Sequence, residues 1–133
     1  MSISNQKGDI GEAAFVFDAS KKGYWTGKMP QGCPYDFVLD KKDGVIHRIQ
    51  VKYRSLSKTG TISLKVTQNT FTNRVSYTSN NIDFFAVYIP ELDKVYLIPV
   101  TELEGKIEVC FRCLPSKNNQ TEKVRDIGLY ESW

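Results

Sequence analysis

The 133-residue sequence has one histidine, three cysteines and no apolar run close to the ~18 residues that span a bilayer. A single histidine, His47, argues against a mechanism built on a Ser-His or Cys-His pair. Cys110 and Cys113 form a Cys-x-x-Cys pair, but only Cys33 and His47 remain to complete a zinc site, which makes buried free thiols the better interpretation. The first residues lack the apolar core of a signal peptide, so we expect a cytoplasmic protein with no membrane partner.

Hydrophobic residues make up 41% of the chain and charged residues 25%, which is the balance of an ordinary globular protein. The length fits one compact domain and leaves no room for separate binding and catalytic modules. We therefore predict a single domain over residues 1–133.

The charge is unevenly distributed along the chain. Residues 41–78 hold eight basic residues against one acid, a net charge of +7, whereas residues 79–104 hold one basic residue against five acids, a net charge of −4. Such a division makes one surface attractive to a polyanion, although an ordinary solvated basic face explains it equally well.

The pattern of apolar and turn residues predicts an α/β (α+β) architecture with a mixed sheet and flanking helices. A helix is expected over residues 9–22, with Asp9 as its N-cap, Gly23 after its end and apolar residues around most of its circumference. Strands are expected over residues 35–40, 45–54 and 61–66, with a hairpin turn at residues 43–44, and over 82–89 and 94–100 as a second hairpin. Residues 68–81 are predicted to be a loop or a short exposed element, and the tail is a weak candidate for a later helix.

One face of the strand over residues 45–54 carries polar side chains that could perform chemistry. Side chains alternate along a strand, so Gln50 and Lys52 share one face, and the predicted hairpin partner brings Asp36 nearby. Glu12 lies among apolar helix residues, where a carboxylate needs a partner, a metal ion or a raised pKa. Magnesium takes oxygen ligands such as Asp36 and Glu12, and Lys52 can orient or deprotonate a water molecule. Alone, each residue has a structural explanation; together they favour a phosphodiester-cleaving site.

Glu12 on the first helix, Pro34-Tyr35-Asp36 at the start of a strand and Gln50-Val51-Lys52 on the next strand resemble the core of the PD-(D/E)xK nucleases. The resemblance covers roughly residues 8–100, and the chain looks most similar to the cyanobacterial group I intron homing endonucleases of this fold. It implies a restriction-endonuclease-like core, the catalytic residues Glu12, Asp36, Gln50 and Lys52, and a divalent metal, Mg²⁺, held by Asp36, Gln50 and Glu12.

The sequence departs from this family's pattern at Gln50, where the family usually has Glu or Asp. An amide offers one neutral oxygen, so weaker metal binding should follow. Some family members resemble this chain in having Gln there. A binding-only domain with a degenerate site, or an inactivating substitution at Gln50, are the alternatives.

The function predicted from these residues is a magnesium-dependent endonuclease that cuts both strands of a specific DNA site. Cutting two strands needs two sites, so we expect a homo-oligomer, either a dimer or a tetramer. A Holliday junction resolvase of the same fold is the nearest alternative, and a DNA-binding module without activity is the other. Most side chains predicted to touch DNA would contact phosphate, with the 68–81 segment offering groups that could read bases; the candidates are Lys28, Lys41, Lys42, Arg54, Lys58, Lys65, Gln68, Asn73 and Arg74.

Overall fold

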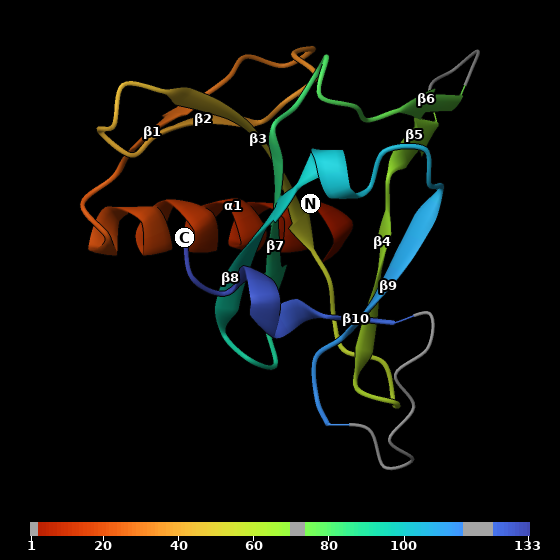
Figure 1. Ribbon diagram of the computed structural model, residues 1–133. Helices are drawn as coiled ribbons and strands as arrows, with labels where there is room; N and C mark the ends of the chain where they lie inside the picture. The colour runs from red at the N-terminus through yellow and green to blue at the C-terminus, as the bar shows by residue number, and fades with distance from the viewer. Residues whose placement is uncertain (1–2, 70–73, 116–123) are drawn as a thin grey trace.

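The computed structural model describes residues 3–69, 74–115 and 124–133 (Figure 1). It begins with the helix α1 (Ile3–Lys21), which lies against a mixed five-stranded sheet of order β1-β2-β3-β7-β8. The strands of this sheet are β1 (Trp25–Lys28), β2 (Phe37–Asp40), β3 (Ile46–Tyr53), β7 (Phe84–Ile89) and β8 (Lys94–Pro99). Only β3 and β7 pair in parallel; the other neighbours in the sheet are antiparallel.

A second, three-stranded sheet of order β10-β9-β4 lies beside the first, and a two-stranded ribbon projects from it (Figure 1). Its strands are β4 (Thr61–Lys65), β9 (Glu108–Arg112) and β10 (Arg125–Asp126), and those of the ribbon are β5 (Thr67–Asn69) and β6 (Arg74–Ser76). Two short 3-10 helices, η1 (Val100–Glu102) and η2 (Ile127–Tyr130), complete the secondary structure of the described residues.

The first sheet is packed on both faces. On one face, α1 contributes Phe15 and Ala19 to a core with Ile49 of β3 and Ala86 of β7. On the other face, side chains of β7 and β8 pack against those of β4 and β9, with Phe111 fully buried among them. The predicted α+β class with a mixed sheet is confirmed. In the described part of the chain, however, α1 is the one α-helix beside the sheet, and a second sheet covers the other face.

The predicted hairpin of β2 and β3 is present, with Asp40 opposite Ile46. Its turn contains Gly44 at φ 90°, a left-handed conformation that glycine adopts without a steric penalty. This register matters for function because it sets Asp36, which precedes β2, next to the middle of β3.

Two expectations for the first helix were wrong. The helix α1 already begins at Ile3, so Asp9 lies inside it and does not cap it. Its apolar residues, which surround most of its circumference, also predicted packing on several sides, but the Ile10 and Phe17 side chains are 49% and 64% exposed. A single stripe through Gly11, Phe15 and Ala19 faces the sheet.

Among the described residues, no helix is long and apolar enough to cross a membrane.

Candidate active site

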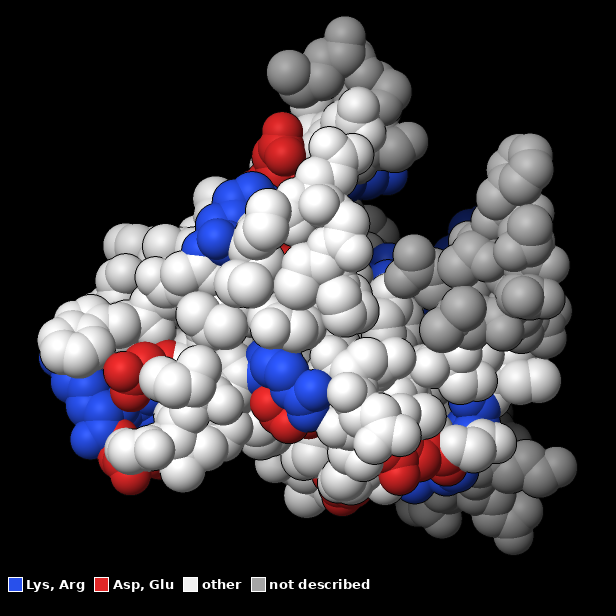
Figure 2. All heavy atoms as spheres, turned by 90° about the horizontal axis from the view of Figure 1, so that it is seen from above, with Lys and Arg blue, Asp and Glu red and all other residues white. Residues whose placement is uncertain are grey.

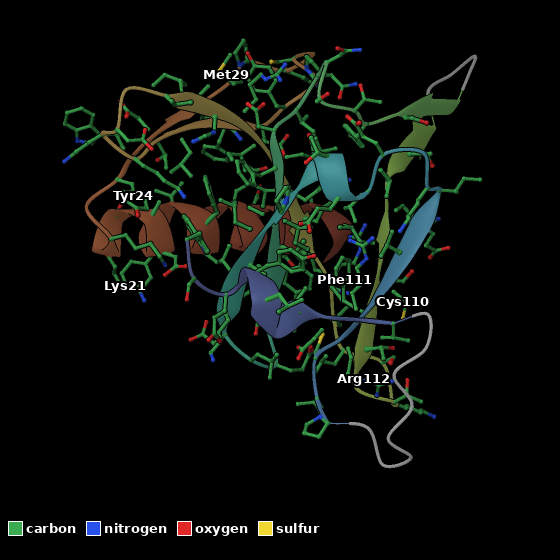
Figure 3. All side chains as sticks on the ribbon, in the orientation of Figure 1. Lys21, Tyr24, Met29, Cys110, Phe111 and Arg112 are labelled. Atoms are coloured by element: carbon green, nitrogen blue, oxygen red, sulfur yellow. The ribbon has the colours of Figure 1, made fainter. Side chains whose placement is uncertain are left out.

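Asp36 lies where β2 separates from β3. Its backbone N–H donates to the Ile49 carbonyl at 2.8 Å, and its Oδ2 accepts a hydrogen bond from the Val51 N–H at 2.9 Å. The Asp36 carbonyl in turn accepts from the N–H of Met29, which lies at the upper edge of the molecule in Figure 3. These bonds fix the carboxylate beside Val51 of β3. Without Asp36, the Val51 N–H would lack a hydrogen-bond acceptor on the side where β2 has not yet begun.

Gln50 and Lys52 point to the same face of β3, as predicted. In the parallel register with β7, Gln50 lies opposite Phe85 and Lys52 opposite Val87, and both of these β7 side chains belong to the core between the two sheets. The other face of β3 meets α1, since Gly11 lies against Val51 and Tyr53. The two polar side chains therefore emerge at the border of a buried core, where their environment is partly desolvated.

Lys52 is half-buried over an aromatic ring. Its Nζ lies 5.6 Å from the centroid of the Tyr77 ring, a distance typical of a cation–π contact. Burial lowers the pKa of Lys52, and the nearby Arg54 lowers it further, while Asp36 acts in the opposite direction. A lowered pKa increases the fraction of neutral amine, which can accept a proton from a water molecule.

Tyr77 is part of this site, although its segment, residues 68–81, was predicted to be a loop or a short exposed element. Its side chain is only 3% exposed, and its ring meets Phe85 edge-on at 5.4 Å between centroids. Burial, together with the charge of Asp36, raises the pKa of Tyr77 to about 12, so the phenol stays protonated at neutral pH.

Glu12 reaches the same place from α1. Its side chain is 28% exposed and forms an ion pair with the ammonium of Lys28, the last residue of β1. Burial raises the pKa of Asp36, the Val51 hydrogen bond lowers it, and the charge of Glu12 raises it again. Glu12 is thus close enough to Asp36 for the two carboxylates to repel each other. Asp36 therefore lies within electrostatic reach of Glu12, Lys28 and Lys52, and Lys28 is a member of this group that the sequence did not indicate.

The donor set at this position suits a hard divalent cation. Asp36 and Glu12 supply carboxylate oxygens and Gln50 an amide oxygen, the ligand types that magnesium and calcium prefer. No three Asp, Glu, His or Cys side chains of the described residues gather closely enough to hold a metal by themselves. Magnesium can be held by one or two carboxylates together with water molecules and a substrate phosphate, so Asp36 and Glu12 suit it even without a third carboxylate. A bound cation would polarise a phosphate and lower the pKa of a coordinated water molecule.

Some of the basic residues are already paired. Arg48, counted in the basic stretch, forms an ion pair with Asp83, and the Arg54 guanidinium donates to the carbonyls of Ser63 and Tyr53. Figure 2 accordingly shows basic and acidic side chains next to one another on the face seen from above. The ion pair with Asp83 reduces the net positive field that the charge count alone suggested, whereas the carbonyls leave the charge of Arg54 in place.

The other predicted DNA contacts are scattered over the molecule. Lys41 and Lys42 lie in the turn between β2 and β3, with their ammonium groups over the rings of Tyr24 and Trp25, at 5.8 Å and 4.3 Å from the centroids. The start of β3 at Ile46, next to these two lysines, lies about 20 Å along the strand from Lys52, at ~3.3 Å per residue. The remaining candidates lie elsewhere: Lys58 and Lys65 are exposed in the turn before β4 and at its end, Gln68 and Arg74 belong to the ribbon, and Asn73 lies outside the described residues.

The cysteines take no part in a metal site within the described chain. Cys110, labelled in Figure 3, lies on β9, and Cys113 follows the end of this strand. All three cysteines are free thiols, and they are half-buried rather than buried as expected. Burial raises the pKa of Cys113 to about 11, which keeps it protonated and a poor metal ligand at neutral pH.

The geometry agrees with the comparisons to known proteins. A family model described as PD-(D/E)XK endonuclease matches residues 3–133. The chain belongs to the PD-(D/E)XK endonuclease family. It is a nuclease, and its substrate is DNA.

A solved structure titled as a bacterial homing endonuclease, I-Ssp6803I, is similar to this PD-(D/E)XK chain. The match has a TM-score of 0.76 and 28% sequence identity, and it covers 96% of this chain and 88% of that one. No curated protein sequence matches significantly. The resemblance to homing endonucleases of this fold, expected from the overall likeness of the chain, is confirmed.

Nucleases of the PD-(D/E)XK family typically use divalent metal ions, which agrees with the oxygen donors found here. Sequence reasoning missed Tyr77 as a member of the site and treated Lys28 only as a DNA contact. An aromatic residue in an otherwise polar segment was the available signal for Tyr77. For Lys28 there was none, because its proximity to Glu12 depends on how β1 lies beside α1.

Proposed function

We propose that this protein is a magnesium-dependent homing-type endonuclease that cuts both strands of a specific DNA site. Glu12, Asp36 and Gln50 are the proposed metal ligands, and Lys52 is the proposed catalytic lysine. A single domain over residues 1–133 would carry the whole site, and a cytoplasmic location fits a DNA substrate. The observation that carries the proposal is the position of Asp36: Glu12, Lys28 and Lys52 all affect the pKa of this one half-buried carboxyl.

The chain's residues divide the work of hydrolysis between them. Asp36 is held by the Val51 N–H so that its other oxygen is available as a ligand. Lys52, half-buried over Tyr77 with a lowered pKa, is suited to take a proton from the attacking water or, when charged, to balance charge on the phosphate. Gln50 lies two residues from Lys52 on the same face of β3. Its side-chain carbonyl oxygen can therefore contribute to the site beside Asp36 and Lys52.

Two strands require two such sites. One chain carries one set of the proposed catalytic residues. The proposed enzyme is therefore a symmetric homo-oligomer, a dimer or a tetramer, that acts on a DNA target of matching symmetry. The proposed DNA contacts remain the candidates named from the sequence; one of them, Arg54, also donates to the carbonyls of Ser63 and Tyr53.

The test is cleavage of duplex libraries with magnesium by the wild type and by Asp36→Asn and Lys52→Ala. Lys94→Met is the matched control, because Lys94 forms an exposed ion pair with Glu131. We expect cutting by the wild type and the control, and a loss of at least ~10²-fold in the other two variants. Cleavage of a four-way junction but no linear duplex would replace the proposal with a junction resolvase. DNA binding without magnesium-dependent cutting would identify a binding module.

A further inference from the structure

The Glu12–Lys28 ion pair occupies a position that the proposed mechanism needs for a metal ligand. The ammonium of Lys28 contacts Oε1 of Glu12, the oxygen donor that α1 contributes to the site. Lys28 also lies close enough to Asp36 for the two charges to attract each other. Among the described basic residues, only Lys28 is in ion-pair contact with a proposed metal ligand.

With this pair formed, the side-chain charges that act on Asp36 nearly balance its own charge. Glu12 and Asp36 carry two negative charges, and Lys28 and Lys52 carry two positive charges. A divalent cation entering this arrangement would create a surplus of positive charge in a partly desolvated place, which is unfavourable. A DNA phosphate that arrives together with the cation supplies the missing negative charge.

Lys28 is free to leave the pair, whereas Lys52 is not. The Lys28 side chain is 63% exposed and stands at the end of the edge strand β1, with its Nζ 5.1 Å from the centroid of the Phe37 ring. The ammonium is thus carried on a flexible, largely exposed side chain that can turn toward solvent. Lys52, in contrast, is half-buried on a central strand over Tyr77.

We propose that Lys28 is an exchangeable counter-cation of the active site. It holds Glu12 before a divalent metal ion binds, and it moves to a DNA phosphate when the metal takes Glu12 as a ligand. This inference rests on the proposed function. It makes binding of metal and DNA mutually reinforcing, since each relieves the charge imbalance that the other creates.

The first test is the affinity of the DNA-free protein for Mn²⁺, measured by calorimetry, because Mn²⁺ accepts the same oxygen ligands. We expect Lys28→Met to bind Mn²⁺ about three to five times more tightly than the wild type. That factor corresponds to the ~0.6–1 kcal/mol of an exposed ion pair. Lys28→Arg keeps the charge and should stay near the wild type, as should the control Lys94→Met, which breaks the Lys94–Glu131 pair.

The second test follows the released ammonium. The dependence of DNA affinity on salt is measured on a mixed-sequence duplex with Ca²⁺ and with a chelator. Each phosphate contact contributes about −0.9 to the slope of log affinity against log salt. Adding Ca²⁺ should steepen the wild-type slope by about 0.9 more than the slope of Lys28→Met, because only the wild type gains the Lys28 contact.

The outcomes separate the two proposals. If the wild type cuts DNA and binds Mn²⁺ but Lys28→Met binds it no more tightly, the exchange is refuted and the proposed function stands. An equal change of slope in both proteins would refute the transfer to phosphate. If neither protein binds Mn²⁺ and the wild type does not cut, the proposed function fails and the exchange fails with it.

Discussion

The ion pair between Arg48 and Asp83 offers the sharpest test of how the site is supported. Asp83 Oδ2 accepts hydrogen bonds from the Arg48 N–H at 2.7 Å and from its Nε at 3.1 Å, and Oδ1 accepts from Nη2 at 2.9 Å. The same guanidinium donates to the carbonyls of Asn80 and Ser79, at 2.9 Å and 2.7 Å. This arrangement joins β3 to the segment that links Tyr77 to β7. We predict that Asp83→Asn and Arg48→Met each destabilise the fold.

The size of the effect follows from the partial exposure of the pair. The two side chains are 29% and 31% exposed, so the energy lies between the ~0.2–1 kcal/mol of an exposed pair and the several kcal/mol of a buried one. Because the contact is bidentate and includes a backbone donor, we expect each single variant to lose about 1–2 kcal/mol of unfolding free energy. The double variant should lose little more than either alone, giving a coupling of about 1 kcal/mol.

The assay is urea unfolding of the wild type, the two single variants and the double variant as a function of pH. Hydrogen bonds and the charge of Arg48 lower the pKa of Asp83. A carboxyl with a lowered pKa in the folded state contributes stability that is present above its unfolded pKa of about 3.9 and is lost as the pH falls through the folded value. The difference between the wild type and Asp83→Asn should therefore be constant above about pH 5 and shrink below pH 4.

Two results would refute this reasoning. A coupling below about 0.3 kcal/mol would mean that the two side chains act independently. A difference between the wild type and Asp83→Asn that stays the same from about pH 5 to pH 2 would mean that ionisation of Asp83 does not contribute to stability.

Three further predictions concern the site itself. Tyr77→Leu should lose about 2–3 kcal/mol in urea unfolding and should slow cleavage per folded molecule, whereas Tyr77→Phe keeps the ring under Lys52 and should lose less than about 1 kcal/mol. Asp36→Asn should abolish cleavage yet gain stability at neutral pH. The pKa of the Asp36 carboxyl is raised in the folded protein, so wild-type stability falls as the pH rises from the pKa of the unfolded state through that of the folded state. Urea unfolding measured as a function of pH should show no such fall in Asp36→Asn. Gln50→Glu restores a third carboxylate and should tighten Mn²⁺ binding about tenfold by calorimetry; unchanged affinity would remove Gln50 from the metal site.

Much of the site was predictable because a strand has a short and strict period. Alternation placed Gln50 and Lys52 on one face, and the turn at Gly44 fixed a register that set Asp36 beside them. Both inferences need only neighbours along the chain or across one hairpin, so they depend on local geometry. The helix was less predictable, since its apolar residues did not indicate which of them would remain exposed. Ile10 and Phe17 do, because the sheet covers only one stripe of α1.

The sequence by itself determined the α+β class, the paired strands and the order of Glu12, Asp36, Gln50 and Lys52 along the chain. Only the tertiary structure decided which charges meet. Lys28 contacts Glu12, Arg48 contacts Asp83, and the aromatic ring of Tyr77 lies against Lys52. Each of these contacts joins two residues that are at least 16 positions apart in the sequence and lie on different elements or loops. The alternation of side chains along a strand carries no information about such contacts, because they depend on how the helix, the two sheets and their connections pack together.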